Sequence, residues 1–232
     1  MTTAHRIAIV VVAELLSMAV TRALLHYYSW SSIEVEAIRT AFRIATAGVC
    51  WWLFRPLIRS RIPKPSVLRS SSLVIGLLLF FTIPVIVGRF YLSPYVALLF
   101  AVASVPVGVK EEFLFRGIVQ NLLVQKYGVL KAVLLTSALF TAWHIGVQQP
   151  TAWVFSQLFL ASVLFGLIYV YSGSIAAVVA IHAAYDALFS FTPLLSSPLR
   201  PVWGFIPLLA SVAFVCYWAW GISKAVVPNQ PL

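Results

Sequence analysis

The sequence has few charged residues and very few acidic ones. Of its 232 residues, 9% are Asp, Glu, Lys or Arg, only six are acidic, and 62% are hydrophobic. Soluble globular domains contain about 25% charged and roughly 45–50% apolar residues. The shortage of charge therefore excludes an ordinary soluble domain and indicates an integral membrane protein.

Cysteine is also scarce. The chain holds only Cys50 and Cys216, and both lie inside apolar segments. A disulfide framework or a cysteine-based metal site needs more cysteines at regular spacings. We therefore expect neither, and interpret both cysteines as packing residues.

Basic residues outnumber acidic ones, giving a formal net charge of +10. Such an excess can indicate a nucleic-acid partner. In membrane proteins, however, lysine and arginine collect in cytoplasmic loops. We therefore expect the lipid bilayer as the surroundings of this chain and no nucleic acid as a partner.

Eight apolar stretches approach the length of about 20 residues that a transmembrane helix needs. They cover approximately residues 7–27, 37–57, 70–91, 95–125, 129–148, 151–171, 174–193 and 202–222. The first resembles a signal peptide but carries Glu14 and has no clear small-residue cleavage site, so we expect it to be retained. The sequence predicts an all-α, polytopic membrane helix bundle of about eight transmembrane helices, with residues 1–232 forming a single membrane domain.

The orientation follows from the loops. The loop after the second stretch is basic and the loop before it is acidic; their charged residues are Arg55, Arg59, Arg61, Lys64 and Arg69, and Glu34 and Glu36. Basic loops stay in the cytoplasm. We therefore expect a multi-pass protein of the plasma (cytoplasmic) membrane with both termini in the cytoplasm.

Two further arginines, Arg39 and Arg43, are four residues apart in the second stretch and so share one helix face. We interpret them as structural charges. Each is expected to pair with an internal partner such as Glu14 or to extend toward a membrane interface.

Two adjacent carboxylates, Glu111 and Glu112, lie in an apolar segment. Ionisable groups at membrane depth are costly and by default indicate a functional site. Glu112 precedes Arg116 by four residues, the order that best suits a helical ion pair. Glu111 points about 100° away around the helix and has no cation at the equivalent spacing. Glu111 is therefore the carboxylate predicted to be free for chemistry.

A histidine is predicted to face Glu111 across a helical hairpin. Gly128 can end one helix, and the next helix then runs back toward His144. Glu111 lies 17 residues before Gly128 and His144 lies 16 after it. At about 1.5 Å per residue, the two side chains reach nearly the same height in the membrane.

A third polar pair lies on the stretch 174–193, where His182 and Asp186 are four residues apart on one helix face. One polar residue in a membrane helix can be a packing contact. Three helices that each bring an acid or a histidine instead predict a reactive site.

These residues suit the hydrolysis of an amide bond. A carboxylate beside a histidine in a poorly solvated site can take a proton from water, and further polar groups can stabilise the charge on an attacked carbonyl oxygen. A serine nucleophile fits less well, because Ser137 and Ser156 have no surrounding motif.

Two alternatives stay open from the residues alone. Glu111, His144 and His182 are also an accepted set of zinc ligands, although the chain has no helical His-Glu-x-x-His motif. A membrane transporter or proton-relay protein also carries buried Glu, His and Asp residues. Inverted repeats would favour the transporter, but the polar residues cluster in the C-terminal half without a counterpart in the N-terminal half.

The three motifs resemble those of a known family. Glu111-Glu112-x-x-x-Arg116, Phe140-x-x-x-His144 and His182-x-x-x-Asp186 are similar to the signature motifs of the CPBP family, which includes the CAAX prenyl proteases and the Abi bacteriocin-processing proteins. The resemblance covers roughly residues 95–193, which we take as the catalytic core.

The resemblance implies an eight-helix intramembrane endopeptidase that acts on a membrane-associated protein or peptide. It implies that Glu111 and His144 activate water, that His182 and Asp186 are the second polar pair, and that Glu112, Arg116 and Phe140 are supporting residues. The prenyl proteases have asparagine where this chain has Asp186. An ionised aspartate cannot donate a hydrogen bond, so Asp186 must be protonated, orient His182 or bind a metal.

Overall fold

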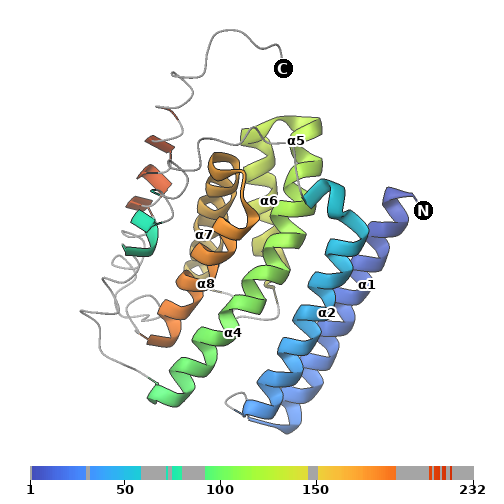
Figure 1. Cartoon of the computed structure of the whole chain (residues 1–232), viewed down its shortest axis with the longest axis vertical. Coiled ribbons are helices and arrows are strands. Elements are labelled where there is room, and N and C mark those ends of the chain that lie inside the picture. Colours follow the sequence, from blue (N-terminus) through green and yellow to red (C-terminus); the bar gives the residue numbers. More distant parts are fainter. Residues whose placement is uncertain are drawn as a thin grey trace.

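A computed structural model describes residues 2–29, 32–58, 92–145 and 151–191, with short pieces inside 72–79 and 209–220. The main described elements are all helices, shown in Figure 1. They are α1 (Thr3–Tyr27), α2 (Ile33–Ile58), α4 (Pro94–Glu112), the π-helix η1 (Phe113–Gln120), α5 (Asn121–Tyr127), α6 (Val129–Trp143), α7 (Ala152–Ser172) and α8 (Ile175–Phe191). The predicted all-α fold is confirmed.

The predicted transmembrane stretches agree only in part with these helices. Two helical segments, His5–Tyr27 and Val154–Ser172, are long and apolar enough to cross a membrane, while Val129–Trp143 and Ile175–Leu188 are apolar but shorter. The stretches 70–91 and 202–222 lie largely outside the described residues. The count of eight transmembrane helices stays a prediction.

A central rod of three consecutive helical segments, α4, η1 and α5, organises the bundle. At its start, the Ser93 hydroxyl accepts a hydrogen bond from the Val96 backbone N–H. Pro94 follows in the first turn, where a backbone N–H would have no partner within the helix, so that the N–H that proline lacks is not needed. The rod packs against α2 on one side and α8 on another. Glu111, Glu112 and Arg116 are thereby placed in the middle of the bundle.

The rod ends at the glycine that the sequence indicates. Gly128 has φ +79°, between the end of α5 and the start of α6. A side chain is strained at such a φ value, whereas glycine is not. The chain then reverses into α6, so the predicted hairpin is present (Figure 1).

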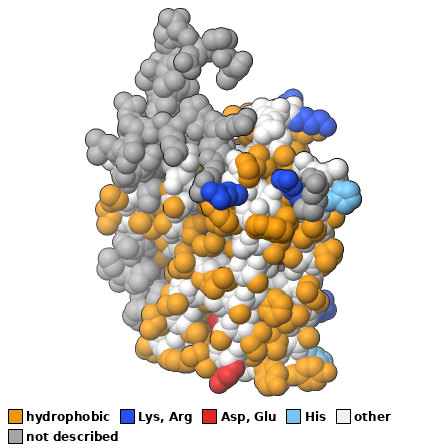
Figure 2. All heavy atoms as spheres, turned by 45° about the vertical axis from the view of Figure 1, so that its right-hand side comes forward, with side chains coloured by type: hydrophobic (Ala, Val, Ile, Leu, Met, Phe, Trp, Pro, Cys, Tyr) orange, Lys and Arg blue, Asp and Glu red, His pale blue; other side chains and the backbone are white. Residues whose placement is uncertain are grey.

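The bundle core is apolar, and much of its outer surface is apolar as well. One buried cluster joins α7 to α8 through residues such as Leu164, Phe165 and Ile181. Large hydrophobic side chains are nevertheless exposed, including Val12 at 63% and Leu130 at 69%. Figure 2 shows hydrophobic side chains over much of the described part of one face, with lysines and arginines toward its upper end. Such a surface suits lipid, because soluble monomers rarely expose large apolar patches.

Gly117 allows the rod to approach α2. A Cβ atom added at Gly117 would lie 2.9 Å from Ile58 Cγ1, whereas one added at Gly48 would meet nothing within 4 Å. We expect Gly117→Ala to lower the free energy of unfolding by about 1–3 kcal/mol through overpacking. Gly48→Ala, the matched control, should be neutral or stabilise the helix by up to about 1 kcal/mol. Thermal unfolding in detergent compares them; equal midpoints would contradict the close contact.

Candidate active site

The four predicted catalytic residues line one cavity of about 420 Å³. Glu111 comes from the end of α4, His144 from the end of α6, and His182 and Asp186 from α8. Phe140 lines the same cavity. Three helices therefore bring together residues that are up to 75 positions apart in the sequence.

Beneath this cavity, Glu112 and Arg116 form the expected ion pair. Arg116 Nη1 donates to Glu112 Oε1 over 3.0 Å, and both side chains are fully buried. Arg116 Nη2 donates to the backbone oxygen of Ser162, at 2.8 Å, and to its hydroxyl, at 2.7 Å. The guanidinium carbon lies 5.2 Å from the ring centre of Phe140 and 5.4 Å from that of Phe165. The pair thus ties η1 to α6 and α7.

His182 connects that buried pair to the cavity. Its Nδ1 lies 2.6 Å from Glu112 Oε1. Because an ionised carboxylate only accepts hydrogen bonds, Nδ1 is the donor. The other ring nitrogen, Nε2, lies 3.4 Å from Asp186 Oδ2 and 3.9 Å from Glu111 Oε2. The ring also stacks on Phe165, with centroids 4.6 Å apart. His182 is therefore fixed by its buried face and presents Nε2 to the cavity.

Glu111 differs from its neighbour Glu112 in having no hydrogen bond to any side chain that the structure describes. It is 9% exposed and lines both the 420 Å³ cavity and a second cavity of about 510 Å³. The nearest candidate counterion in sequence, Lys110, instead bonds Glu14 of α1 over 2.9 Å. The carboxylate of Glu111 thus faces open space.

His144 is the C-cap residue of α6 and lines the same two cavities as Glu111. Its Nδ1 lies 2.8 Å from the backbone oxygen of Phe140. A carbonyl oxygen only accepts, so Nδ1 carries the proton and Nε2 of a neutral ring is left as an acceptor. The Phe140 ring packs against the imidazole, with centroids 4.6 Å apart. Phe140 therefore orients His144 through both its backbone and its ring.

The π-helix was not predicted. The sequence indicates one continuous helix over 95–125, but the backbone widens directly after Glu112 and returns to α-helix at Asn121. π-helical turns are rare and often occur at functional sites. The spacing of apolar residues in the sequence cannot reveal a change from α-helix to π-helix, because this change shifts each residue only slightly around the helix axis relative to the residue before it.

The charges of the first two helices are paired differently from our expectation. Glu14 bonds Lys110, and it is Glu36 that accepts hydrogen bonds from Arg39, over 2.8 Å, and from Arg43. Glu36 precedes the arginines by three and seven residues, so all three lie on one face of α2. Arg39 and Arg43 also line the 420 Å³ cavity. Sequence reasoning treated them as structural and so missed their place at the site.

The candidate zinc ligands do not form a metal site in this structure. Among the residues that the structure describes, no three His, Cys, Asp or Glu side chains are grouped to hold a metal ion. A catalytic zinc site needs three protein ligands at about 2.0–2.2 Å from the ion. The contacts at Nδ1 of His144 and His182 leave Nε2 of both rings available, and a histidine that binds a metal commonly donates its other N–H to a carboxylate or a carbonyl. The glutamate-type and the metal-dependent alternatives therefore both stay predictions.

Residues 93–188 match the model of the Rce1-like family, described as type II CAAX prenyl endopeptidase Rce1-like. The matched segment runs from the start of α4 into α8 and includes all three motifs. It confirms the resemblance of those motifs to the CAAX prenyl proteases; the wider CPBP and Abi grouping stays a prediction. No curated protein and no solved structure matches the chain significantly.

Proposed function

We propose that this chain, in which residues 93–188 match the Rce1-like family, is an intramembrane endopeptidase that hydrolyses a peptide bond of a membrane-associated protein or peptide. The observation that carries the proposal is the pairing of Glu111 and His144. A carboxylate without a side-chain hydrogen bond in the described part of the chain and a histidine with an accepting Nε2 line the same cavity. Such a pair can bind and deprotonate one water molecule.

The proposed reaction uses groups of the chain itself. Glu111 takes a proton from a water that His144 orients, and the water oxygen bonds to the carbonyl carbon of the substrate. The carbonyl oxygen becomes negatively charged and is stabilised by His182 in its imidazolium form, which donates from Nδ1 to Glu112 and from Nε2 to this oxygen. Glu111 then gives its proton to the leaving nitrogen as the C–N bond breaks. The products are a new carboxylic acid and a new amine, and the acid then ionises by giving its proton to the amine or to solvent.

The remaining residues of the motifs are proposed to position this machinery. Glu112 fixes Nδ1 of His182, and Arg116 holds Glu112 in place. Asp186, 3.4 Å from Nε2, orients the imidazole from the side of the cavity. This role needs no proton on the aspartate and no metal, which is why we prefer it to the other two.

We further propose that the end of the bundle where α1 begins and α5 meets α6 faces the cytoplasm. Near this end lie the described basic residues Arg6 at the start of α1, Arg55 in the last turn of α2, Lys126 in the last turn of α5 and Lys131 in the first turn of α6; Figure 1 shows these helix ends at the same end of the bundle. Arg6 bonds the Leu53 backbone oxygen, which places the start of α1 beside the end of α2. Basic residues mark the cytoplasmic side, and four more of them, Arg59, Arg61, Lys64 and Arg69, follow the end of α2 in the sequence. The N-terminus is then cytoplasmic.

This orientation places the cavity nearer the opposite side of the membrane. Glu111 precedes Tyr127, the last residue of α5, by 16 positions, which corresponds to about 24 Å along the rod. The hydrocarbon core is about 30 Å thick. We therefore expect the substrate to reach Glu111 from the outer half of the bilayer.

Single cysteines can test the orientation in a Cys216→Ser background, because Cys50 is fully buried. Ala152→Cys lies at the exposed start of α7, and Leu130→Cys at the exposed start of α6. In intact cells, we expect a membrane-impermeant maleimide to label the first variant and to label the second only after lysis. The reverse pattern would place the cavity toward the cytoplasm.

The function itself is tested by measuring peptide cleavage by purified protein in proteoliposomes. The substrates are a peptide pool, which consists of apolar peptides that partition into the membrane and have randomised residues. Cleavage is read by mass spectrometry. We expect His144→Ala to lower the cleavage rate about 10²–10⁴-fold, the usual contribution of acid–base groups. His26→Ala, which alters a histidine in the last turn of α1, should cleave normally. Full activity of His144→Ala, or proton flux without cleavage, would contradict the proposal; the second result would favour a proton relay.

A further inference from the structure

Two arginines of α2 lie where three cavities meet. Arg39 and Arg43 line the 420 Å³ cavity with Glu111 and His144, and the 510 Å³ cavity beside α1. They also line a smaller cavity of about 170 Å³ that includes Asp186. Helix α2 lies outside residues 93–188, so the family match says nothing about these arginines.

The two arginine side chains are more exposed than the carboxylate that bonds them. The side chain of Glu36 is 3% exposed, whereas those of Arg39 and Arg43 are 20% and 13% exposed. Both arginines use Nη1 to bond Glu36. A guanidinium carries five N–H donors, and the buried Nε of Arg39 has no partner among the described residues. Donors therefore remain for a ligand.

The two arginines share one hydrogen-bonded carboxylate. Arg39 and Arg43 both form salt bridges with Glu36. Glu111 and Asp186 are the other carboxylates that share a cavity with the arginines, but neither forms a salt bridge with Arg39 or Arg43 within the described residues. Charged groups at membrane depth pair with one another, and among the described residues Glu36 is the carboxylate that forms salt bridges with these two arginines.

We propose that Arg39 and Arg43 bind a carboxylate of the peptide substrate and so hold the peptide beside Glu111. This inference rests on the proposed endopeptidase function and names a chemical feature of its substrate. A planar guanidinium matches a carboxylate with two parallel hydrogen bonds. The carboxylate is either the C-terminal group of the peptide or an acidic side chain near the cleaved bond.

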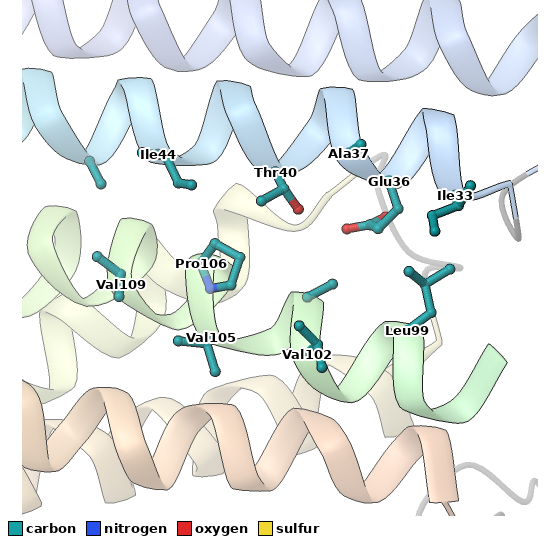
Figure 3. Close-up of a pocket in the computed structure, with 12 residues that line it drawn as sticks. Ile33, Glu36, Ala37, Thr40, Ile44, Leu99, Val102, Val105, Pro106 and Val109 are labelled. Carbon is teal, nitrogen blue, oxygen red and sulfur yellow. The ribbon is translucent and has the colours of Figure 1, made fainter. Parts of the chain in front are cut away.

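An apolar groove leads away from the arginines. This groove of about 630 Å³ lies between α2 and α4, and Figure 3 shows Ile33, Glu36 and Thr40 on one side of it with Leu99 and Pro106 on the other. Glu36 and Ala103 line both the groove and the 170 Å³ cavity. The groove thus borders the cavity that the arginines line and suits the apolar residues next to the bound carboxylate.

The inference is tested by binding, using Glu111→Gln protein so that no peptide is cleaved. The peptide pool is prepared without acidic residues in two forms, as free acids and as C-terminal amides. Each form is passed over immobilised protein in nanodiscs, and retention is measured by mass spectrometry. A third arm uses amides that contain one aspartate or glutamate.

We expect the retained amount of the free acids or of the acidic amides to exceed that of the neutral amides about tenfold or more. Hydrogen bonds to charged groups are strong enough to give such a difference in binding. The form retained identifies the source of the carboxylate. Arg43→Gln should abolish the preference and Arg43→Lys should restore part of it. Arg55→Gln, near the other end of α2, should leave it unchanged. The double variant Glu36→Gln/Arg39→Gln removes one charge of each sign and so leaves the net charge unchanged. It separates a loss of peptide binding from a loss of folding.

Equal retention of all three peptide forms would overturn the inference, as would a preference that survives both arginine substitutions. Failure of the proposed function has a different signature. Wild-type protein would then cleave no peptide, while the binding comparison would still report whether the arginines recognise a carboxylate.

Discussion

Replacing Glu111 with glutamine is expected to lower the rate of peptide cleavage about a thousandfold or more. A general acid–base group usually contributes about 10²–10⁴-fold to the rate. Glutamine has nearly the same shape but cannot accept the proton of the attacking water. No described side chain is hydrogen-bonded to Glu111, and its nearest described ionic contact is His182 Nε2 at 3.9 Å. The free energy of unfolding should therefore change by less than about 1 kcal/mol.

The test compares cleavage of the peptide pool with thermal unfolding of the same protein samples. Glu111→Asp is the matched control, because it keeps a carboxylate but retracts it by one methylene. We expect it to retain partial activity. A Glu111→Gln protein that is folded and cleaves at the wild-type rate would remove Glu111 from the chemistry.

Loss of Arg116 should have the largest effect on folding. Arg116→Met leaves the fully buried carboxylate of Glu112 without its arginine, and removing one partner of a buried ion pair costs about 3–5 kcal/mol. It also removes the two hydrogen bonds to Ser162. We expect a large fall in the free energy of unfolding, measured by denaturant titration in detergent.

A double variant separates the lost charge balance from the lost packing. Glu112→Gln together with Arg116→Met leaves no isolated charge and keeps an oxygen that can accept from Nδ1 of His182. We expect it to be more stable than Arg116→Met alone. If Arg116→Met alone unfolds like the wild type, the buried pair does not support the site.

The helical hairpin and the height of its polar residues could be predicted from sequence because both depend on local geometry. A glycine at Gly128 ends the rod, and the rise of the helices places Glu111 and His144 at similar heights. The ion pair of Glu112 and Arg116 followed from a spacing of four residues. Each of these inferences needs only one helix or one turn.

The contacts between distant helices could not be predicted in the same way. Glu112 and His182 are 70 residues apart, and no periodicity relates them. The pairing of Glu14 with Lys110 and of Glu36 with two arginines depends on how α1, α2 and α4 pack. Charge alone made Glu14 an equally good partner for any of these cations.

The chemistry of the site is tested most directly by hydrolysis in ¹⁸O-labelled water. Purified wild-type protein in proteoliposomes is incubated with the peptide pool, and new C-termini are analysed by mass spectrometry. We expect ¹⁸O in the new carboxylates formed by the wild type and no new termini with Glu111→Gln. New termini at equal rates in both proteins, or none in either, would contradict water activation by Glu111 in an intramembrane endopeptidase.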